Sequence, residues 1–253
     1  MRRAIVIAIA LLLQASGVAR AQEVTVAAAI SLKESLTQCA AEFEKDSKTH
    51  IRFSFGGSGE LATQIEQGAP IDLFISAAQD QIDQLAKAKV VEPSSHVIVA
   101  RNRLVLIVPA LAKNPPAGFD ELQDGSKVTR IAIGNPKTVP AGKYASQVIS
   151  RLKQMNKQRL IYAMNVRQVL DYVERGEVSA GIVYQTDALA NTKVKVVATA
   201  DESLHDPIVY PAVVIKNGAN ATAAGEFLKF LQSERAQKIF EGNGFPPTTQ
   251  PTK

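Results

Sequence analysis

Short apolar segments alternate with amphipathic segments along almost the whole chain, and this alternation constrains the fold more than any other sequence feature. The apolar segments have the length of strands and lie at 23–29, 51–55, 71–77, 103–109, 129–135, 179–184, 194–199 and 211–216. Helical patterns lie at 32–48, 58–67, 79–88, 140–153, 166–174, 220–232 and 234–241. Repeated strand–helix–strand units predict an α/β fold, in which parallel strands form sheets with helices on both faces.

The first 21 residues predict a secretory signal peptide. Arg2 and Arg3 precede a short apolar run at 4–13, and residues 19–21 (ARA) form a small-x-small cleavage pattern. The run is shorter than the roughly 20 residues that a membrane-spanning helix needs. We therefore predict an exported, periplasmic protein whose mature chain begins at Gln22.

Charge and cysteine content exclude some classes of protein. The predicted signal peptide holds three arginines and no acid, so its removal lowers the net charge from +5 to +2. Such a mild, mixed charge does not favour a nucleic-acid partner. Cys39 is the single cysteine, which leaves no internal disulfide framework. Its spacing from Leu36 and Phe43 predicts a small buried hydrophobic side chain.

Ligands of open α/β sheets bind where the carboxyl ends of strands meet the amino ends of helices. In this chain those junctions fall at 27–32, 56–61, 134–143, 165–167 and 184–187. The candidate ligand-binding residues are therefore sought there.

One of these junctions resembles a dinucleotide-binding motif. Residues 57–62 read G-S-G-E-L-A after a predicted strand, which fits G-x-G-x-x-A around Gly57 and Gly59, and Asp80 follows downstream. The motif follows the second strand of the mature chain rather than the first, and nicotinamide cofactors are scarce outside the cell. A dinucleotide-dependent enzyme built on these glycines stays open as the less favoured alternative.

Other catalytic and metal motifs are incomplete. Glu60 occupies the position where a hydrolase nucleophile elbow around Ser58 would need glycine. Tyr144 follows Gly142 and Lys143 where a phosphate-binding loop needs Ser or Thr. The histidines, at 50, 96 and 205, have no second His or Cys at ligand spacing, so neither a catalytic triad nor a metal-cation site is predicted.

Hydroxyl groups and free backbone amides at predicted helix starts form a more consistent pattern. Ser31 and Ser58 each follow a strand, and Pro140 opens a helix before Ala141 and Gly142. Each serine alone is explained as an N-cap. Several such groups converging on one cleft would form an anion site, because helix amino termini offer unpaired N–H groups and partial positive charge.

The mature chain closely resembles the periplasmic molybdate-binding proteins of ABC importers, the ModA type. The resemblance is carried by VTVAAAISL, FGGSGELATQIEQGAPIDLFISA, GNPKTVPAGKYA, NVRQVLDYVERGEVSAGIVYQTDA and FLQSERAQKIFEGNGF. It implies a two-lobed type II periplasmic binding protein with a two-strand hinge, each lobe a mixed, mostly parallel sheet flanked by helices. The first lobe would comprise 22–101 and 207–253, and the second 102–206.

The resemblance also implies the binding residues. In that family the oxyanion is held by two hydroxyl residues after the first two strands, by backbone amides and by a tyrosine. Carried over, these are Ser31, Ser58, Ala141, Val166 and Tyr184.

The implied function is capture of molybdate or tungstate and delivery to a cognate membrane ABC permease, by a monomer without enzymatic activity or cofactor. A binding protein for another small oxyanion, such as sulfate, stays open as an alternative. All the implied binding residues contribute hydrogen-bond donors. Such a site disfavours phosphate, whose proton at neutral pH needs an acceptor.

Overall fold

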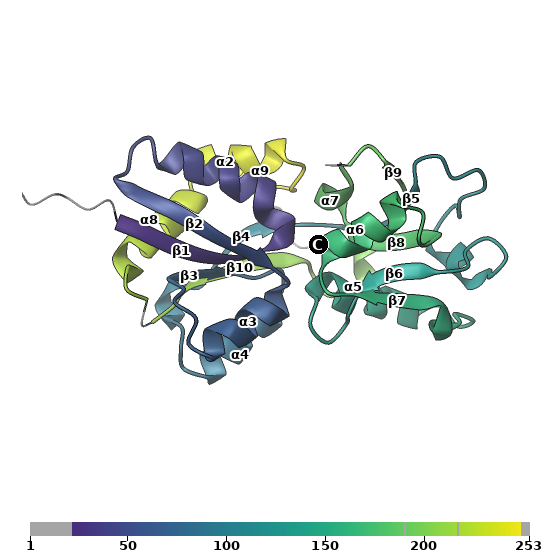
Figure 1. The fold of residues 1–253 in the computed structure, drawn as a ribbon, viewed down its shortest axis with the longest axis horizontal. Helices are drawn as coiled ribbons and strands as arrows, with labels where there is room; N and C mark the ends of the chain where they lie inside the picture. Colours follow the sequence, from purple (N-terminus) through teal and green to yellow (C-terminus); the bar gives the residue numbers. More distant parts are fainter. Residues whose placement is uncertain (1–21, 190, 217, 249–253) are drawn as a thin grey trace, which may run out of the picture.

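The computed structural model describes residues 22–189, 191–216 and 218–248. The predicted signal peptide and its cleavage site lie outside these residues. The chain forms two lobes side by side, each a five-stranded sheet with flanking helices (Figure 1). Among the described residues, no helix has both the length and the apolar character to cross a membrane.

The first lobe contains a sheet with the strand order β2-β1-β3-β10-β4. Its strands are β1 (Gln22–Ala29), β2 (Thr49–Gly56), β3 (Leu73–Ile75), β4 (Val97–Arg101) and β10 (Val209–Val214). The strand β1 pairs in parallel with β2 and β3, whereas β10 runs antiparallel to β3 and β4. The sheet is therefore mixed and mostly parallel.

Helices cover both faces of this sheet. They are α2 (Lys33–Phe43), α3 (Ser58–Glu66), α4 (Gln79–Lys87), α8 (Ala221–Leu231) and α9 (Glu234–Gly242). Figure 1 shows α2 and α9 above the sheet and α3 and α4 below it. Side chains alternate between the two cores: Val26 packs with the α2 side, and Ala27 with the α3 side.

The second lobe repeats this arrangement with the order β7-β6-β8-β5-β9. Its strands are β5 (Leu104–Pro109), β6 (Ile131–Gly134), β7 (Leu160–Ala163), β8 (Ala180–Tyr184) and β9 (Val194–Thr199). Its helices are α5 (Pro140–Ser150), α6 (Val166–Glu174) and α7 (Gln185–Leu189). The strand β6 is parallel to β7 and β8, and β5 is antiparallel to β8 and β9.

The chain crosses between the lobes twice, from β4 to β5 through residues 102–103 and from β9 to β10 through residues 200–208. The strand that enters each sheet after a crossing, β5 or β10, is the antiparallel one. Both crossings therefore deliver a strand to the second position from one edge of a sheet.

Several elements differ from those predicted from the sequence. The elements β4, β7 and α7 were not predicted, and the first helix was predicted to reach residue 48, whereas α2 ends at Phe43. Ser47 closes that end, because its N–H bonds back to the Phe43 carbonyl. The strand β7 reads LIYA, and it lies partly exposed at a sheet edge.

The prediction for Cys39 is confirmed, since its side chain is fully buried in the first lobe. Burial raises the pKa of the thiol to about 12, so it stays protonated. The residue therefore acts as a small apolar side chain.

Candidate ligand-binding site

A small cavity of about 10 Å³ lies between the two lobes. It is lined by Ala29, Ile30, Ser31, Gly56, Gly57, Ser58 and Ala77 of the first lobe and by Val139, Pro140, Ala141, Asn165, Val166 and Tyr184 of the second. All five predicted site residues are thus in its wall. By this measure the cavity has about the volume that a single water molecule needs.

Ser31 and Ser58 enter from the first lobe. Ser31 lies in the 3-10 turn Ile30–Leu32 that follows β1, and Ser58 is the first residue of α3. Both are buried. Neither caps a helix: the N-cap of α3 is Gly57, and that of α2 is Leu32. The N-cap explanation of the two serines is therefore wrong.

Each serine oxygen instead meets a buried protein group. The backbone N–H of Ala77 donates to Ser58 Oγ over 3.0 Å. Ser31 Oγ lies 3.0 Å from the hydroxyl of Tyr210, which is on β10. The serines are thus held in place by neighbours in or next to their own sheet.

Residues at the starts of three helices line the same cavity. Ser58 opens α3, Ala141 is the second residue of α5, and Val166 opens α6. First-turn N–H groups have no acceptor within their helix. In the described part of the chain, none of these three N–H groups donates to a protein acceptor, and neither does that of Ser31. The cavity therefore collects free N–H donors from both lobes.

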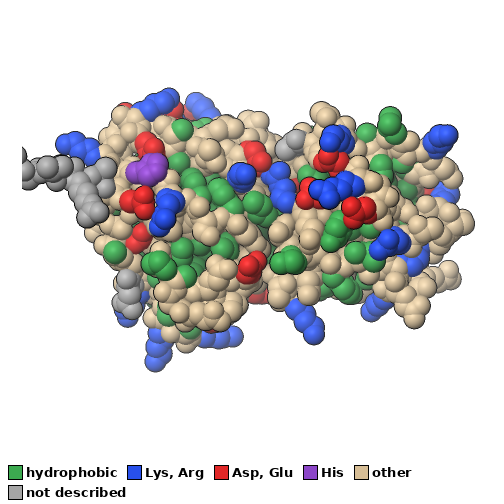
Figure 2. Space-filling model, viewed as in Figure 1, with side chains coloured by type: hydrophobic (Ala, Val, Ile, Leu, Met, Phe, Trp, Pro, Cys, Tyr) green, Lys and Arg blue, Asp and Glu red, His purple; other side chains and the backbone are tan. Residues whose placement is uncertain are grey.

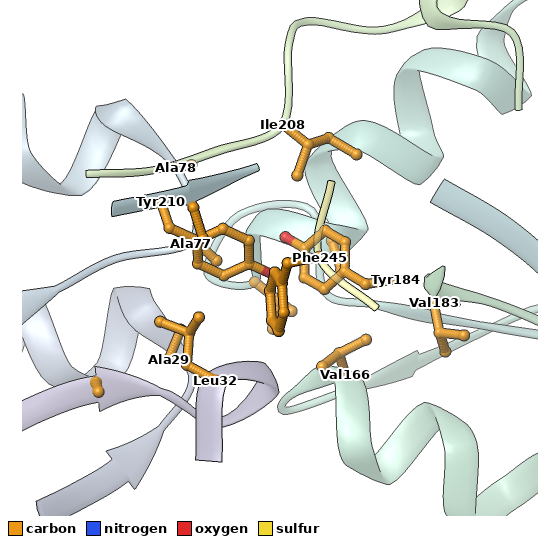
Figure 3. Close-up of a cluster of buried hydrophobic side chains, with 14 of the residues drawn as sticks. Ala29, Leu32, Ala77, Ala78, Val166, Val183, Tyr184, Ile208, Tyr210 and Phe245 are labelled. Atoms are coloured by element: carbon orange, nitrogen blue, oxygen red, sulfur yellow. The ribbon is translucent and has the colours of Figure 1, made fainter. Parts of the chain in front are cut away.

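Tyr184 ends β8 and supplies a phenol from the second lobe. Its side chain is 1% exposed, and its hydroxyl has no hydrogen-bond partner among the described residues. Figure 3 shows that Tyr184 and Tyr210 approach from opposite sides with their hydroxyl ends toward each other, and their ring centroids are 5.9 Å apart. Burial raises the pKa of Tyr184 well above its ordinary value, so the phenol keeps its proton.

The chemistry of the cavity wall is that of neutral donors. Among its described lining residues there is no Asp, Glu, Lys or Arg. A buried, unpaired hydroxyl costs free energy unless a ligand accepts its hydrogen bond. The donor set fits a small, fully ionised anion with several acceptor oxygens.

The glycines of the dinucleotide-like motif have a different role. A Cβ on Gly57 would lie 2.9 Å from the carbonyl oxygen of Met164, and one on Gly59 would lie 2.4 Å from that of Thr138. The Gly59 N–H also donates to the Thr138 oxygen over 3.1 Å. These positions need glycine because the backbone of the second lobe packs directly against them.

The space in front of this motif is therefore filled by protein. Pockets for organic ligands enclose roughly 300–1,000 Å³, far more than this cavity. In this structure the motif has no room for a dinucleotide.

Ion pairs between residues outside the cavity wall join the lobes. Lys143 Nζ on α5 lies 2.6 Å from Asp80 Oδ2 on α4. Arg167 on α6 contacts Glu34 on α2. On the face shown in Figure 2, the surfaces of the two lobes meet, and side chains of both charges are interspersed.

Arg167 also contacts a buried carboxylate that sequence reasoning missed. Its Nε lies 2.8 Å from Asp187 Oδ1, although the contact lacks hydrogen-bond alignment. Asp187 is fully buried, and its burial raises its pKa to about 7 against the lowering effect of Arg167. Arg167 and Asp187 lie in the predicted junctions at 165–167 and 184–187, but their pairing was not predicted, because they come from separate helices.

The three histidines lie apart from the cavity. His50 contacts Glu44, His96 contacts Gln79, and the ring of His205 contacts the carbonyl of Asp206. Within the described residues, no group of three or more His, Cys, Asp or Glu side chains is arranged to hold a metal ion.

Comparison with known proteins agrees with the two-lobed geometry. A sequence profile of the bacterial extracellular solute-binding proteins matches residues 24–246. This chain belongs to that family.

Individual members of the solute-binding family are similar over nearly the full length. A putative ABC transporter substrate-binding lipoprotein of Bacillus subtilis is 39% identical over 224 residues, covering 87% of this chain and 85% of its own. The molybdate-binding protein ModA of Haemophilus influenzae is 37% identical over 232 residues, covering 90% and 91%.

A solved structure shows the same fold. The substrate-binding domain of a putative molybdenum ABC transporter from Clostridium difficile superposes with a TM-score of 0.70 at 42% identity, covering 89% of this chain and 99% of that one. The mixed sheets and two lobes predicted from the sequence are thereby confirmed.

Proposed function

We propose that this chain captures molybdate or tungstate between its lobes and delivers it to a membrane ABC permease. The observation that carries the proposal is the buried, unpartnered hydroxyl of Tyr184 in a cavity that also contains Ser31 and Ser58. Two similar proteins, from Haemophilus influenzae and Clostridium difficile, are described as binding molybdate or as serving a molybdenum transporter.

The proposed ligand set is that of the sequence analysis. Three hydroxyl groups, of Ser31, Ser58 and Tyr184, and backbone N–H groups that include those of Ala141 and Val166 would surround a tetrahedral dianion. Hydrogen bonds to a charged partner are each worth about 1.5–3 kcal/mol, so several of them support tight binding without a Lys or Arg ligand. The oxyanion is a transported ligand and not a cofactor.

Binding would be coupled to closure of the lobes. The proposed first lobe is 22–101 with 207–253, and the second is 102–206, with the two crossings as the hinge. The ligand would draw the lobes together because its donors come from both. The closed form, a monomer without enzymatic activity, would then present its surface to the permease. Export through cleavage before Gln22 would place it in the periplasm.

Calorimetric titration of refolded, ligand-free protein tests the proposal. We expect molybdate and tungstate to bind with dissociation constants below micromolar. Absence of binding by every oxyanion tried, including sulfate and phosphate, would refute it. Tight binding of sulfate alone would replace molybdate with a different ligand at the same site.

A further inference from the structure

A hydrogen-bonded chain of buried side chains leads from a lobe crossing to the cavity. Asn102, between β4 and β5, donates from Nδ2 to the hydroxyl of Tyr210 over 3.0 Å. The Tyr210 hydroxyl lies 3.0 Å from Ser31 Oγ. All three side chains are buried, and Asn102 and Tyr210 are outside the cavity wall.

The direction of the first bond is fixed by the backbone. The N–H of Arg103 donates to Asn102 Oδ1 over 2.9 Å, so the carbonyl side of the amide faces that N–H. The NH₂ group is then the side that faces Tyr210, and its other proton goes to Thr186 Oγ1 over 2.9 Å. Both amide protons of Asn102 are thus in use.

The direction of the second bond follows by proton count. The Tyr210 oxygen accepts from Asn102, and a phenol has a single proton to donate. Ser31 Oγ is the acceptor within reach of that proton. Burial raises the pKa of Tyr210, so the proton is present at neutral pH.

We infer that Asn102 and Tyr210 are positioning residues that force the Ser31 hydroxyl to act as a donor and so select fully ionised oxyanions. Because Ser31 Oγ accepts from Tyr210, its own proton is free for the ligand. Ser58 is held in the same state by the Ala77 N–H. Each serine oxygen then has one of its two acceptor lone pairs occupied by a protein donor, which favours donation of its own proton to the ligand. The inference rests on the proposed function, since it concerns an oxyanion bound at Ser31.

The hydrogen-bonded side chains also connect the site to both crossings. Asn102 lies on the first crossing, Tyr210 is the second residue of the strand after the return crossing, and Thr186 is on α7 of the second lobe. Side chains of both lobes must therefore come together before the proton order, meaning which hydroxyl donates to which, is set.

Tyr210→Phe tests the inference, because it keeps the ring and removes the hydroxyl that donates a hydrogen bond to Ser31. The readout is the ratio of sulfate affinity to hydrogen phosphate affinity, each measured by competition against molybdate at mildly alkaline pH. These two dianions are similar in size and differ by one proton. We expect the ratio to fall about tenfold, because a freed Ser31 hydroxyl can accept from the phosphate O–H, which otherwise costs roughly 1–3 kcal/mol when buried unpaired.

Tyr172→Phe is the matched control. Tyr172 is a half-buried tyrosine on α6, and its hydroxyl forms none of the hydrogen bonds found among the described residues. This variant should retain the wild-type ratio. A loss of packing in Tyr210→Phe would weaken both anions together and leave the ratio unchanged, which would overturn the inference.

Asn102→Asp introduces an almost isosteric side chain that should reverse the direction of these hydrogen bonds. A carboxylate accepts from Tyr210, so the tyrosine oxygen would accept from Ser31, and the serine would turn a lone pair toward the cavity. We expect Asn102→Asp to bind molybdate about tenfold more weakly than Tyr210→Phe does. The ratio of sulfate affinity to phosphate affinity should again fall. The added charge repels both dianions, so the ratio reports proton order.

The outcomes separate the two claims. If the wild type binds no oxyanion, the proposed function fails. If the wild type binds oxyanions but both variants keep the wild-type ratio, the proposed function stands and the positioning role of Asn102 and Tyr210 is refuted.

Discussion

The backbone N–H of Ala77 donates to Ser58 Oγ over 3.0 Å, which ties the loop after β3 to the first residue of α3. The bond occupies the serine as an acceptor and leaves its proton for a ligand. The Ser58 hydroxyl therefore takes part in one structural hydrogen bond and one proposed hydrogen bond to the ligand. Removing this hydroxyl should affect both stability and binding.

Replacement of either serine by alanine should weaken molybdate binding by about 1.5–3 kcal/mol, the usual value of a hydrogen bond to a charged partner. Titration calorimetry measures the change. Ser58→Ala should also lower the free energy of unfolding by about 1–3 kcal/mol, because it leaves the Ala77 N–H buried and unpaired. Unchanged affinity in both variants would remove the serines from the site.

Tyr184→Phe should weaken binding without harming the ligand-free fold. The unpaired hydroxyl of Tyr184 is a cost in the empty protein, so its removal should leave thermal stability unchanged or slightly higher. Ligand-induced compaction, measured by small-angle scattering, should be smaller. Equal compaction and equal affinity would show that the phenol is not a ligand.

Gly59→Ala should block the contact between the lobes. Its Cβ would meet the Thr138 carbonyl oxygen at 2.4 Å, so the lobes would have to separate. We expect at least a tenfold loss of oxyanion affinity with circular dichroism unchanged. Gly225→Ala on α8 is the control, since its Cβ would meet no atom within 4 Å. An affinity loss in both variants, or in neither, would contradict the prediction.

Asp187 should make stability depend on pH. Its pKa is about 7 in the folded protein and 3.8 ordinarily, so between these values the folded chain holds a proton that the unfolded chain has lost. The free energy of unfolding should therefore fall as pH rises through this window.

Asp187→Asn, which cannot titrate, should lose this component of the pH dependence. Thermal unfolding at several pH values between about 4 and 8 measures it across the window set by the two pKa values. Asp171→Asn, an exposed substitution on α6, should keep the wild-type slope. A slope that Asp187→Asn leaves unaltered would show that Asp187 is ionised throughout.

The site should rank oxyanions by protonation and size. Molybdate and tungstate should bind alike, because they match in charge and shape and nearly in size. Sulfate is smaller, so donors set for a larger ion form long, weak bonds to it. Hydrogen phosphate should be weakest, because it also needs an acceptor. Competition titrations at one pH and ionic strength would contradict the order if sulfate or phosphate fell within about tenfold of molybdate, or 1.4 kcal/mol.

The sequence by itself determined the elements that carry the candidate site. The helix at 166–174 and the strand at 194–199 have the predicted bounds, and the helix buries a regular apolar face of Val166, Val169, Leu170 and Val173. The strand–helix junctions also placed Ser31 and Ser58 at strand ends, where the cavity lies. These features depend on local patterns, which the sequence contains in full.

Only the tertiary structure decided what those residues contact. The glycines at 57 and 59 have the spacing of a nucleotide motif, yet the backbone of the second lobe packs against them. Asn102, Tyr210 and Ser31 are far apart in the chain, and their proton order depends on bonds between a crossing, a strand and a turn. Local periodicity holds no information about such contacts, because they form only when two sheets and two crossings come together in space.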